Sequence, residues 1–164
     1  MKEIKLTQGQ VAIVDDWRFD ELCQYKWYAK WDSKTQSFRA MHAFRLESGE
    51  QKVVFMHSYI MRTPSGMVTD HINQNTLDNQ ESNLRACTDG QNKMNRSKQA
   101  NNTSGYKGVA RNGSGWRVQI QVDGKKMCFG TYKSPEDAAK VYDKEVIKVH
   151  GEFASLNFPS TGGK

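Results

Sequence analysis

The amino-acid sequence predicts an α+β fold built from two small domains. Residues 1–97 hold short apolar and aromatic runs separated by glycine and polar turns, a pattern typical of short strands. Residues 105–159 hold three strand-like runs and then one amphipathic run of helical period, which predicts an antiparallel sheet packed on one helix. Residues 98–104 contain no apolar side chain larger than alanine and are expected to form a linker, with a tail at residues 160–164.

Composition and charge favour the same division. The residue types AVILMFWYC make up 37% of the 164 residues, which is low for one compact domain and fits two small ones better. Residues 97–164 contain 11 Lys and Arg against 6 Asp and Glu, a net charge of +5, whereas residues 1–96 contain 13 against 12. Such an excess is expected of a polyanion-binding domain, although a basic surface that only aids solubility would have the same charge.

The N-terminal lobe, residues 1–56, is expected to be rich in strands. Residues 2–14 predict two short strands around a glycine turn, with one or two helical turns after them. Apolar and aromatic runs predict three more strands, at residues 25–31, 38–44 and 52–56. The tryptophans of this lobe are expected in the core or half-buried, and not as a base-stacking surface: Trp17, Trp27 and Trp31.

Asp70 and His71 are the strongest candidates for catalytic residues. They precede an amide-rich run, I-N-Q-N-T-L-D-N-Q-E-S-N. A carboxylate suits a hard divalent cation and an imidazole suits a general base, so the pair fits the hydrolysis of a phosphodiester. Neighbouring strand residues point to opposite faces, so both can serve one site only if the strand ends there. A hydrogen-bonded turn without chemistry would contain the same two residues.

Two further elements are expected behind this pair. Asn83 precedes a short apolar run at residues 84–87 that predicts a second strand. Thr88 and Asp89 can then cap a helix that carries Asn92.

The segment 70–92, D-H-I-N-Q-N-T-L-D-N-Q-E-S-N-L-R-A-C-T-D-G-Q-N, resembles the HNH endonucleases of the ββα-metal fold. In their phage and intron-encoded branch the pattern is D-H-I-x-x-N-x-x-D-N-x-x-x-N-L-R-x-x-T-x-x-x-N, and this sequence fills every fixed position. The resemblance implies that Asp70 and Asn92 bind one divalent metal ion, Mg²⁺ or Mn²⁺. It also implies that His71 is the general base and that Asn83 orients its ring.

Two more residues are candidates for substrate contact, His57 and Arg85. His57 lies in M-H-S-Y-I-M, which resembles a segment that often precedes the motif in this branch. A hydrogen-bonded structural histidine is an equally open interpretation. The nuclease motif as a whole is expected over residues 56–96.

The C-terminal part predicts strands at residues 106–111, 116–122 and 125–132, with N-G-S-G and D-G as hairpin turns. In the middle strand the apolar side chains alternate with a polar row suited to phosphates and base edges, Arg117, Gln119 and Gln121. Ser134 is a candidate N-cap for a helix that runs to about Val149 and covers the apolar face of the sheet.

These residues, with Y-K-G-V, G-W-R-V-Q-I, F-G-T-Y, E-D-A-A-K-V-Y-D and L-N-F-P, resemble the DNA-binding domain of the plant apetala and ethylene-response factors. The resemblance implies a sheet in the major groove of double-stranded DNA, with contacts from Lys107, Asn112, Gln119, Gln121 and Lys126. Ala110 and Cys128 replace an arginine and a tryptophan of the plant domains, so their target sequence cannot be transferred.

The remaining signals bound the cellular setting. The cysteines, Cys23, Cys87 and Cys128, form no C-x-x-C pair and are expected to be reduced structural thiols. No apolar run has the length of a signal peptide or a membrane span. We expect no membrane association, no obligate protein partner, and a cytoplasmic location in a bacterial host or phage-infected cell.

Taken together, the residues and the two resemblances predict a metal-dependent DNA endonuclease of homing or phage type. Two other functions fit parts of the sequence. One is a non-catalytic DNA-binding regulator, and the other is a structural phage protein that binds nucleic acid.

Overall fold

The computed structural model describes residues 1–96, 98, 102–122 and 124–159. The chain forms two compact units, Met1–Asn92 and Lys93–Lys164, both of mixed α and β structure, which confirms the predicted α+β class. Parts of the predicted linker, the tail at residues 160–164 and the hairpin residue Asp123 lie outside the described residues. No helix among the described residues has the length and apolar character needed to cross a bilayer.

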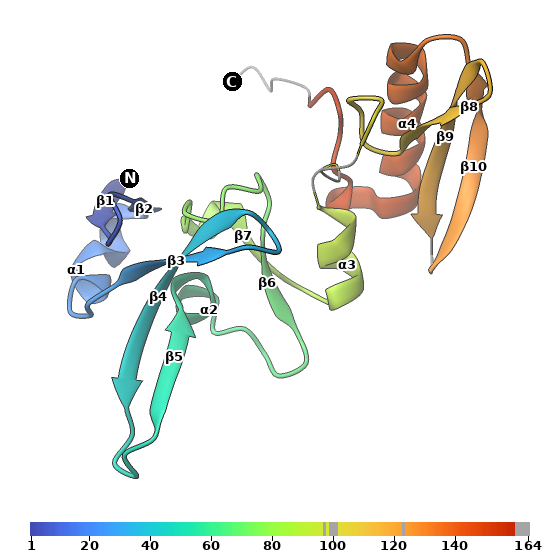
Figure 1. Cartoon of the computed structure of the whole chain (residues 1–164). Helices are drawn as coiled ribbons and strands as arrows, with labels where there is room; N and C mark the ends of the chain where they lie inside the picture. The colour runs from blue at the N-terminus through green and yellow to red at the C-terminus, as the bar shows by residue number, and fades with distance from the viewer. Residues whose placement is uncertain (97, 99–101, 123, 160–164) are drawn as a thin grey trace. The chain divides into compact units, whose positions relative to one another are not determined.

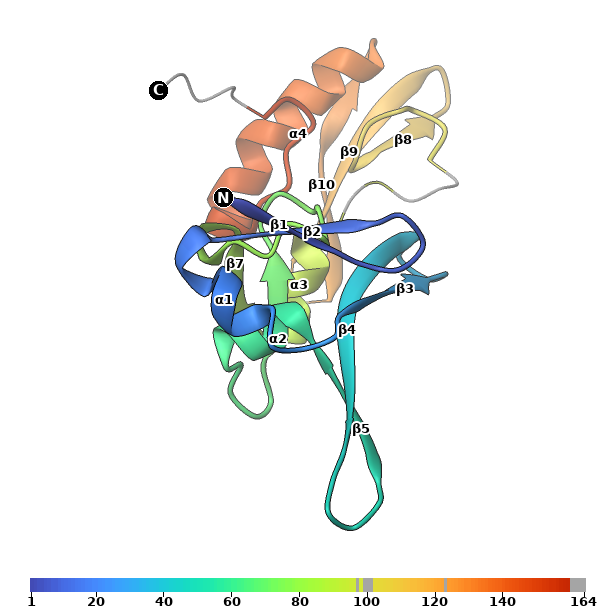
Figure 2. The ribbon, with the colours of Figure 1, turned by 90° about the vertical axis from the view of Figure 1, so that its left-hand side faces the viewer.

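The first unit contains three antiparallel sheets (Figure 1). The first pairs β1 with β2, the second has the order β3-β4-β5, and the third pairs β6 with β7. The β4–β5 hairpin extends away from the rest of the unit in both ribbon views (Figure 1, Figure 2). The strands are β1 (Lys2–Lys5), β2 (Val11–Val14), β3 (Tyr28–Asp32), β4 (Ser37–Arg45), β5 (Gln51–Phe55), β6 (Val68–His71) and β7 (Leu84–Cys87).

Short helices connect these sheets. The helical turns predicted after residue 14 are present as η1 and α1, whereas α2 was not expected from the sequence. The helix predicted behind the second strand of the motif is α3, which begins at Asp89 and contains Asn92. The helices of this part are η1 (Asp16–Arg18), α1 (Phe19–Leu22), α2 (Met56–Met61), η2 (Glu81–Asn83) and α3 (Asp89–Met94).

The core of the first unit joins the N-terminal strands to α2 and β7. Val14, Leu22 and Met56 are fully buried in it, and Trp27 donates its Nε1 hydrogen to the Leu22 carbonyl at 2.8 Å. The expectation for the tryptophans is confirmed for Trp27 but wrong for Trp17, which is 65% exposed. Trp31 is 47% exposed and lies next to the turn that connects β3 and β4.

The second unit is a three-stranded antiparallel sheet of order β10-β9-β8 with one helix on one face, as predicted. Val118 and Ile120 of β9 pack against Tyr142 and Val146 of the helix, and all four are buried. The elements are β8 (Val109–Asn112), β9 (Gly115–Val122), β10 (Lys125–Tyr132), α4 (Pro135–His150) and η3 (Gly151–Phe153).

Side-chain hydrogen bonds cap the start of α4 and tie its middle to the chain that follows it. Ser134 is the N-cap and accepts from the Asp137 amide at 3.0 Å, and the helix ends before Gly151, as predicted. Farther along, the buried carboxylate of Asp143 accepts from the backbone amides of Asn157 and Phe158, each at 2.8 Å. Asp143 therefore anchors the L-N-F-P segment to the helix.

Gly108 explains why β8 begins three residues later than the predicted strand. Its φ of +74° is rarely adopted by other residues, and an added Cβ would lie 2.0 Å from the Tyr142 ring. The chain therefore turns at Gly108 to pass closely over α4, and the ladder begins at Val109.

Candidate active site

Asp70 and His71 are the last two residues of β6, so the strand ends where the sequence requires. Asp70 pairs with Arg85 of β7 and His71 with Leu84. Both Asp70 and His71 are only 6% exposed. After them the chain leaves the ladder, with the Ile72 amide donating to the Asn83 carbonyl at 2.8 Å. Neighbouring strand residues point to opposite faces, but Asp70 is close enough for its charge to act on the pKa of His71.

Arg85 holds the Asp70 carboxylate from the neighbouring strand. Its Nε and Nη2 donate to Asp70 Oδ2 at 2.9 and 2.8 Å. The two side chains are 12% and 7% exposed, so this is an almost buried ion pair. Charge-assisted bonds of this kind fix the orientation of the carboxylate. Arg85 is therefore bonded to Asp70 here, and a substrate contact by Arg85 remains a prediction.

The imidazole of His71 is oriented by Asn79. His71 Nε2 lies 3.4 Å from Asn79 Oδ1, and Asn79 itself is 1% exposed. Because the amide oxygen only accepts, Nε2 carries the hydrogen in this arrangement and Nδ1 has the basic lone pair of the neutral ring. Burial is the main cause that lowers the pKa of His71 below its ordinary value, and the nearby Asn79 and Asp70 oppose it. The ring is therefore neutral near pH 7, as a general base must be.

His57 of α2 lies directly against His71. The ring centroids are 5.0 Å apart with the planes at 85°, and the His57 ring also stacks on Phe55. Burial, with smaller contributions from the charges of His71 and Arg39, lowers the pKa of His57 from 6.5 to about 3. The structure thus brings His57 to the site that the sequence suggested, in its neutral form.

Asn83 closes the loop between the two strands. Its Oδ1 accepts from the Asn73 amide at 2.9 Å, and its Nδ2 donates to the Asp78 carbonyl at 2.8 Å. The hydrogen bond to the imidazole that was expected from Asn83 comes from Asn79. The sequence contained a signal for Asn79, because it is the second residue of the fixed D-N pair in the motif.

Asp70 and Asn92 are the two residues expected to bind a divalent metal ion. Asn92 is half-buried on α3, and its backbone amide donates to the Thr88 carbonyl at 2.9 Å. No group of three or more His, Cys, Asp or Glu side chains suited to a metal occurs among the described residues. A carboxylate and an amide oxygen nevertheless fit Mg²⁺, which typically takes one or two carboxylates and fills the remaining positions with water and phosphate. The chemistry of Asp70 and Asn92 thus suits a hard ion.

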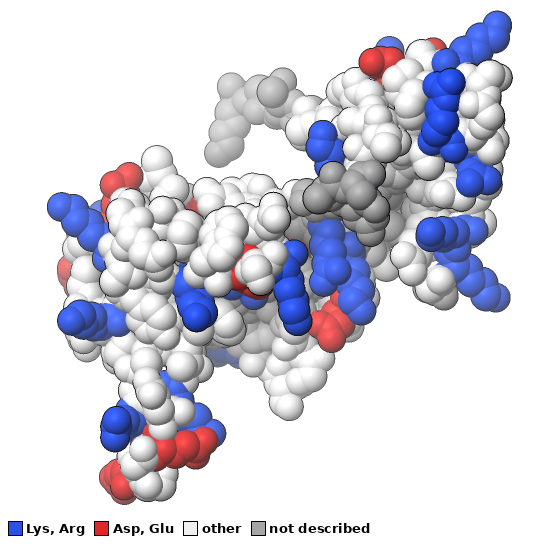
Figure 3. Space-filling model, viewed as in Figure 1, with Lys and Arg blue, Asp and Glu red and all other residues white. Residues whose placement is uncertain are grey.

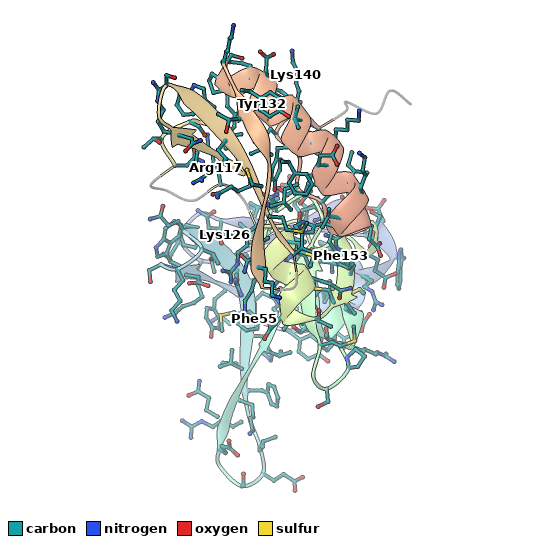
Figure 4. All side chains as sticks on the ribbon, turned by 90° about the vertical axis from the view of Figure 1, so that its right-hand side faces the viewer. Phe55, Arg117, Lys126, Tyr132, Lys140 and Phe153 are labelled. Carbon is teal, nitrogen blue, oxygen red and sulfur yellow. The ribbon has the colours of Figure 1, made fainter. Side chains whose placement is uncertain are left out.

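In the second unit the predicted polar row lies on the face of the sheet opposite α4. Gln119 pairs with Cys128 and Gln121 with Lys126, so these side chains share that face with Arg117. Arg117 and Lys126 are labelled in Figure 4. Asn112 lies on it as well and donates to Thr131 Oγ1 at 3.3 Å. The buried Nε of Arg117 has no hydrogen-bond partner among the described residues. Lysine and arginine predominate on the side of this unit shown in Figure 3.

Lys107 differs from the other residues of the expected DNA-contacting set. Its Nζ donates to the Met94 carbonyl at the end of α3 at 2.6 Å. Burial lowers the pKa of Lys107 to about 8. Its ammonium group therefore caps a helix, which leaves a DNA contact by Lys107 a prediction.

Comparisons with known proteins bear on both units. The HNH endonuclease family matches residues 62–94. A protein of Acanthamoeba polyphaga mimivirus, named as an uncharacterized HNH endonuclease, is 27% identical over 153 residues, which cover 92% of this chain and 76% of that protein. Protein 3.8 of Escherichia phage T7 is 32% identical over 93 residues, or 56% of this chain and 76% of the phage protein.

A third relative matches a shorter stretch. The transcription factor of Arabidopsis thaliana, named as containing AP2/ERF and B3 domains, is 42% identical over 57 residues, which cover 33% of this chain and 17% of the plant protein. This partial match suggests a likeness to AP2/ERF domains only weakly. The family match at residues 62–94 contains Asp70, His71 and Asn79, and the chain belongs to the HNH endonucleases.

Proposed function

We propose that this nuclease is a metal-dependent DNA endonuclease of homing or phage type. In this proposal the first unit hydrolyses the phosphodiester and the second unit binds the duplex. The observation that carries it is the pairing of a fixed Asp70 carboxylate with a neutral, oriented His71 at the end of β6.

In the chemical step His71 acts as the general base. Its Nδ1 takes a proton from the attacking water, while Asn79 keeps the ring from turning. Asn83 contributes indirectly, because it holds together the loop that carries Asn79. His57 contacts the His71 ring and limits its movement. His57 is also a candidate for substrate contact.

Asp70 and Asn92 would hold one divalent ion, Mg²⁺ or Mn²⁺. Such an ion supplies charge neutralisation at the phosphate and the leaving oxygen. Arg85 keeps the Asp70 carboxylate in place from β7. The site therefore has one carboxylate already oriented by the protein fold.

The open face of the β8–β10 sheet is the proposed DNA-binding surface. It presents Asn112, Arg117, Gln119, Gln121 and Lys126, residue types that contact phosphates and base edges in the major groove. A plant relative that matches 57 residues of this chain is named as a transcription factor. The viral relatives support an action inside a phage-infected or host cell.

A plasmid-nicking assay tests the proposal. Supercoiled DNA should be nicked or linearised in Mg²⁺ or Mn²⁺ and remain intact in EDTA. His71→Ala should abolish cleavage but retain DNA binding, because a general base acts in the chemical step. His42→Gln, which changes a histidine on β4 outside the site, is the matched control and should cleave like the parent. Cleavage by His71→Ala at the parental rate would disprove the assignment.

A further inference from the structure

The sheet of β3, β4 and β5 has a pocket that the proposed mechanism does not use. Its volume is about 320 Å³. Cationic side chains outnumber acidic ones around it, with Lys30, Lys34 and Arg39 against Asp32. The lining residues are Lys30, Trp31, Asp32, Ser33, Lys34, Arg39, Met41 and Phe55.

The register of the sheet places the cationic groups together. Lys30 is directly opposite Arg39, and Met41 is directly opposite Phe55. Because cross-strand partners share a face and alternate residues do too, all four side chains lie on one face of the sheet.

A series of ring contacts connects this face to His71. The guanidinium carbon of Arg39 lies 5.7 Å from the centroid of the Phe55 ring. Phe55 stacks on His57 with centroids 5.2 Å apart, and His57 contacts His71 at 5.0 Å. Phe55 is labelled in Figure 4, on the last residue of β5. The pocket is thus separated from the catalytic base by two rings.

Arg39 is only partly neutralised. One Nη2 contact to Asp32 at 3.3 Å links two side chains that are 29% and 30% exposed. The Nε of Arg39 is buried and has no hydrogen-bond partner among the described residues. After burial and the charge of His71, the positive charge of Arg39 is the third cause that lowers the pKa of His57. With 29% of its side chain exposed at the pocket, the Arg39 guanidinium is suited to bind an oxyanion there.

We propose that this pocket binds a backbone phosphate of the DNA beside the bond that is cut, with Arg39 as the main phosphate-binding residue. Lys30 and Lys34 add positive charge at the pocket, and Arg39 acts as a positioning residue for the strand. The inference rests on the proposed cleavage of DNA. It gives the N-terminal sheet a role in substrate binding that the family motif at residues 62–94 does not contain.

The alternative is a purely structural Arg39, held by Asp32 and the Phe55 ring. The two roles differ in their salt dependence, because each phosphate contact contributes about 0.9 to the slope of log K against log salt. The full-length His71→Ala protein, which should bind without cutting, is the background for binding measurements on duplex DNA. Arg39→Gln should weaken binding about tenfold at low salt and reduce the slope by about 0.9, the share of one phosphate contact.

Three further variants complete the test. Arg39→Lys should recover part of the affinity and slope because it keeps the charge, and Arg45→Gln, on the same strand and the same face but outside the pocket, should change neither. Asp32→Asn should tighten binding about threefold, since it removes the competing carboxylate but keeps the oxygen that accepts from the Lys34 amide. A gain in affinity cannot result from misfolding.

Steady-state cleavage kinetics of variants that keep His71 should also distinguish a binding role of Arg39 from a structural one. Arg39→Gln should raise KM more than it lowers kcat, because Arg39 binds the strand and does not touch the reacting atoms. An unchanged salt slope in Arg39→Gln, or an unchanged affinity in Asp32→Asn, would overturn the proposal. If the parent cuts no DNA, the proposed function fails, while the binding slopes still decide whether Arg39 meets phosphate.

Discussion

Asn79 Oδ1 and His71 Nε2 lie 3.4 Å apart in the interior of the first unit, and this contact determines which ring nitrogen is basic. We expect Asn79→Asp to retain the acceptor and add a negative charge, which raises the pKa of His71. The rate of DNA cleavage should then require higher pH than in the parent. A pH–rate profile measures the shift, and Asn83→Asp is the comparison because Asn83 contacts backbone groups of the loop. An unshifted profile in Asn79→Asp would show that Asn79 does not orient the base.

Acid should destabilise the first unit through His57. Its pKa is lowered from 6.5 to about 3, so between these values the unfolded chain binds a proton that the folded chain does not. The contribution to stability is therefore complete above pH 6.5 and is lost as the pH falls, at up to about 1.4 kcal/mol per pH unit. Denaturant titrations from pH 7 to pH 4 should show a smaller loss in His57→Phe. His42→Phe should keep the parental loss of stability. If stability falls equally with pH in the two variants, His57 is not the group responsible.

Arg85→Met should destabilise the protein because it leaves the Asp70 carboxylate buried without its ion-pair partner. The expected loss is about 3 kcal/mol, the cost typical of breaking a buried ion pair from one side. Asp70→Asn combined with Arg85→Met should cost less than Arg85→Met alone. Thermal unfolding of the two single variants and the double variant gives the coupling energy. A strictly additive double variant would mean that the pair contributes no coupling.

Gly108→Ala should destabilise the second unit by about 3 kcal/mol or more, since the added Cβ meets the Tyr142 ring and the backbone keeps a positive φ. Gly113→Ala is the matched control. Its φ is +59° but nothing lies within 4 Å of the added Cβ, so only the backbone cost of about 1–2 kcal/mol applies. Equal losses in the two variants, measured by chemical denaturation, would show that the Tyr142 contact is unimportant.

Residues on the open face of the second sheet should make two kinds of DNA contact, some to phosphates and others to base edges. Lys126→Ala should weaken binding to all duplexes about equally, whereas Gln121→Ala should weaken a preferred sequence selectively, by about 1–3 kcal/mol. Lys140→Ala on α4 removes the same charge from the other side of the sheet and is the control. Binding of the full-length His71→Ala protein to random and selected duplexes separates these outcomes. A loss in Lys140→Ala equal to that in Lys126→Ala would place the DNA elsewhere.

Local patterns predicted much of the fold. The period-two alternation in residues 116–122, the Ser134 cap and the glycine at the end of α4 each depend on neighbours in sequence, and each is found as expected. Trp17 was misjudged because its exposure depends on which distant elements cover it. The helix α2 was not predicted, because its six residues are too few to show a helical period.

The candidate site was predictable as a set of residues but not as a set of contacts. His57 does contact His71, and Asp70 precedes His71 at the end of β6. The partner of the imidazole is Asn79 because of how the chain between β6 and β7 folds back, which spacing in the motif does not reveal. Arg39 carried no sequence signal, since only the pairing of β4 with β3 and β5 brings it near Phe55.

The loop that carries Asn79 is hydrogen-bonded to β2, near the beginning of the chain. Ile13 of β2 donates its amide to the Leu77 carbonyl at 2.9 Å and accepts from the Asn79 amide at 2.8 Å, so one residue of the N-terminal hairpin holds both sides of the imidazole's partner. Local opening of β2 would release the ring of His71 without unfolding the strands that carry it. Hydrogen exchange at the Asn79 amide should therefore measure how often the His71 ring loses its fixed orientation. A protein shortened to the family motif would retain every motif residue. It would lose β2, the strand that holds Asn79 in place beside the catalytic base.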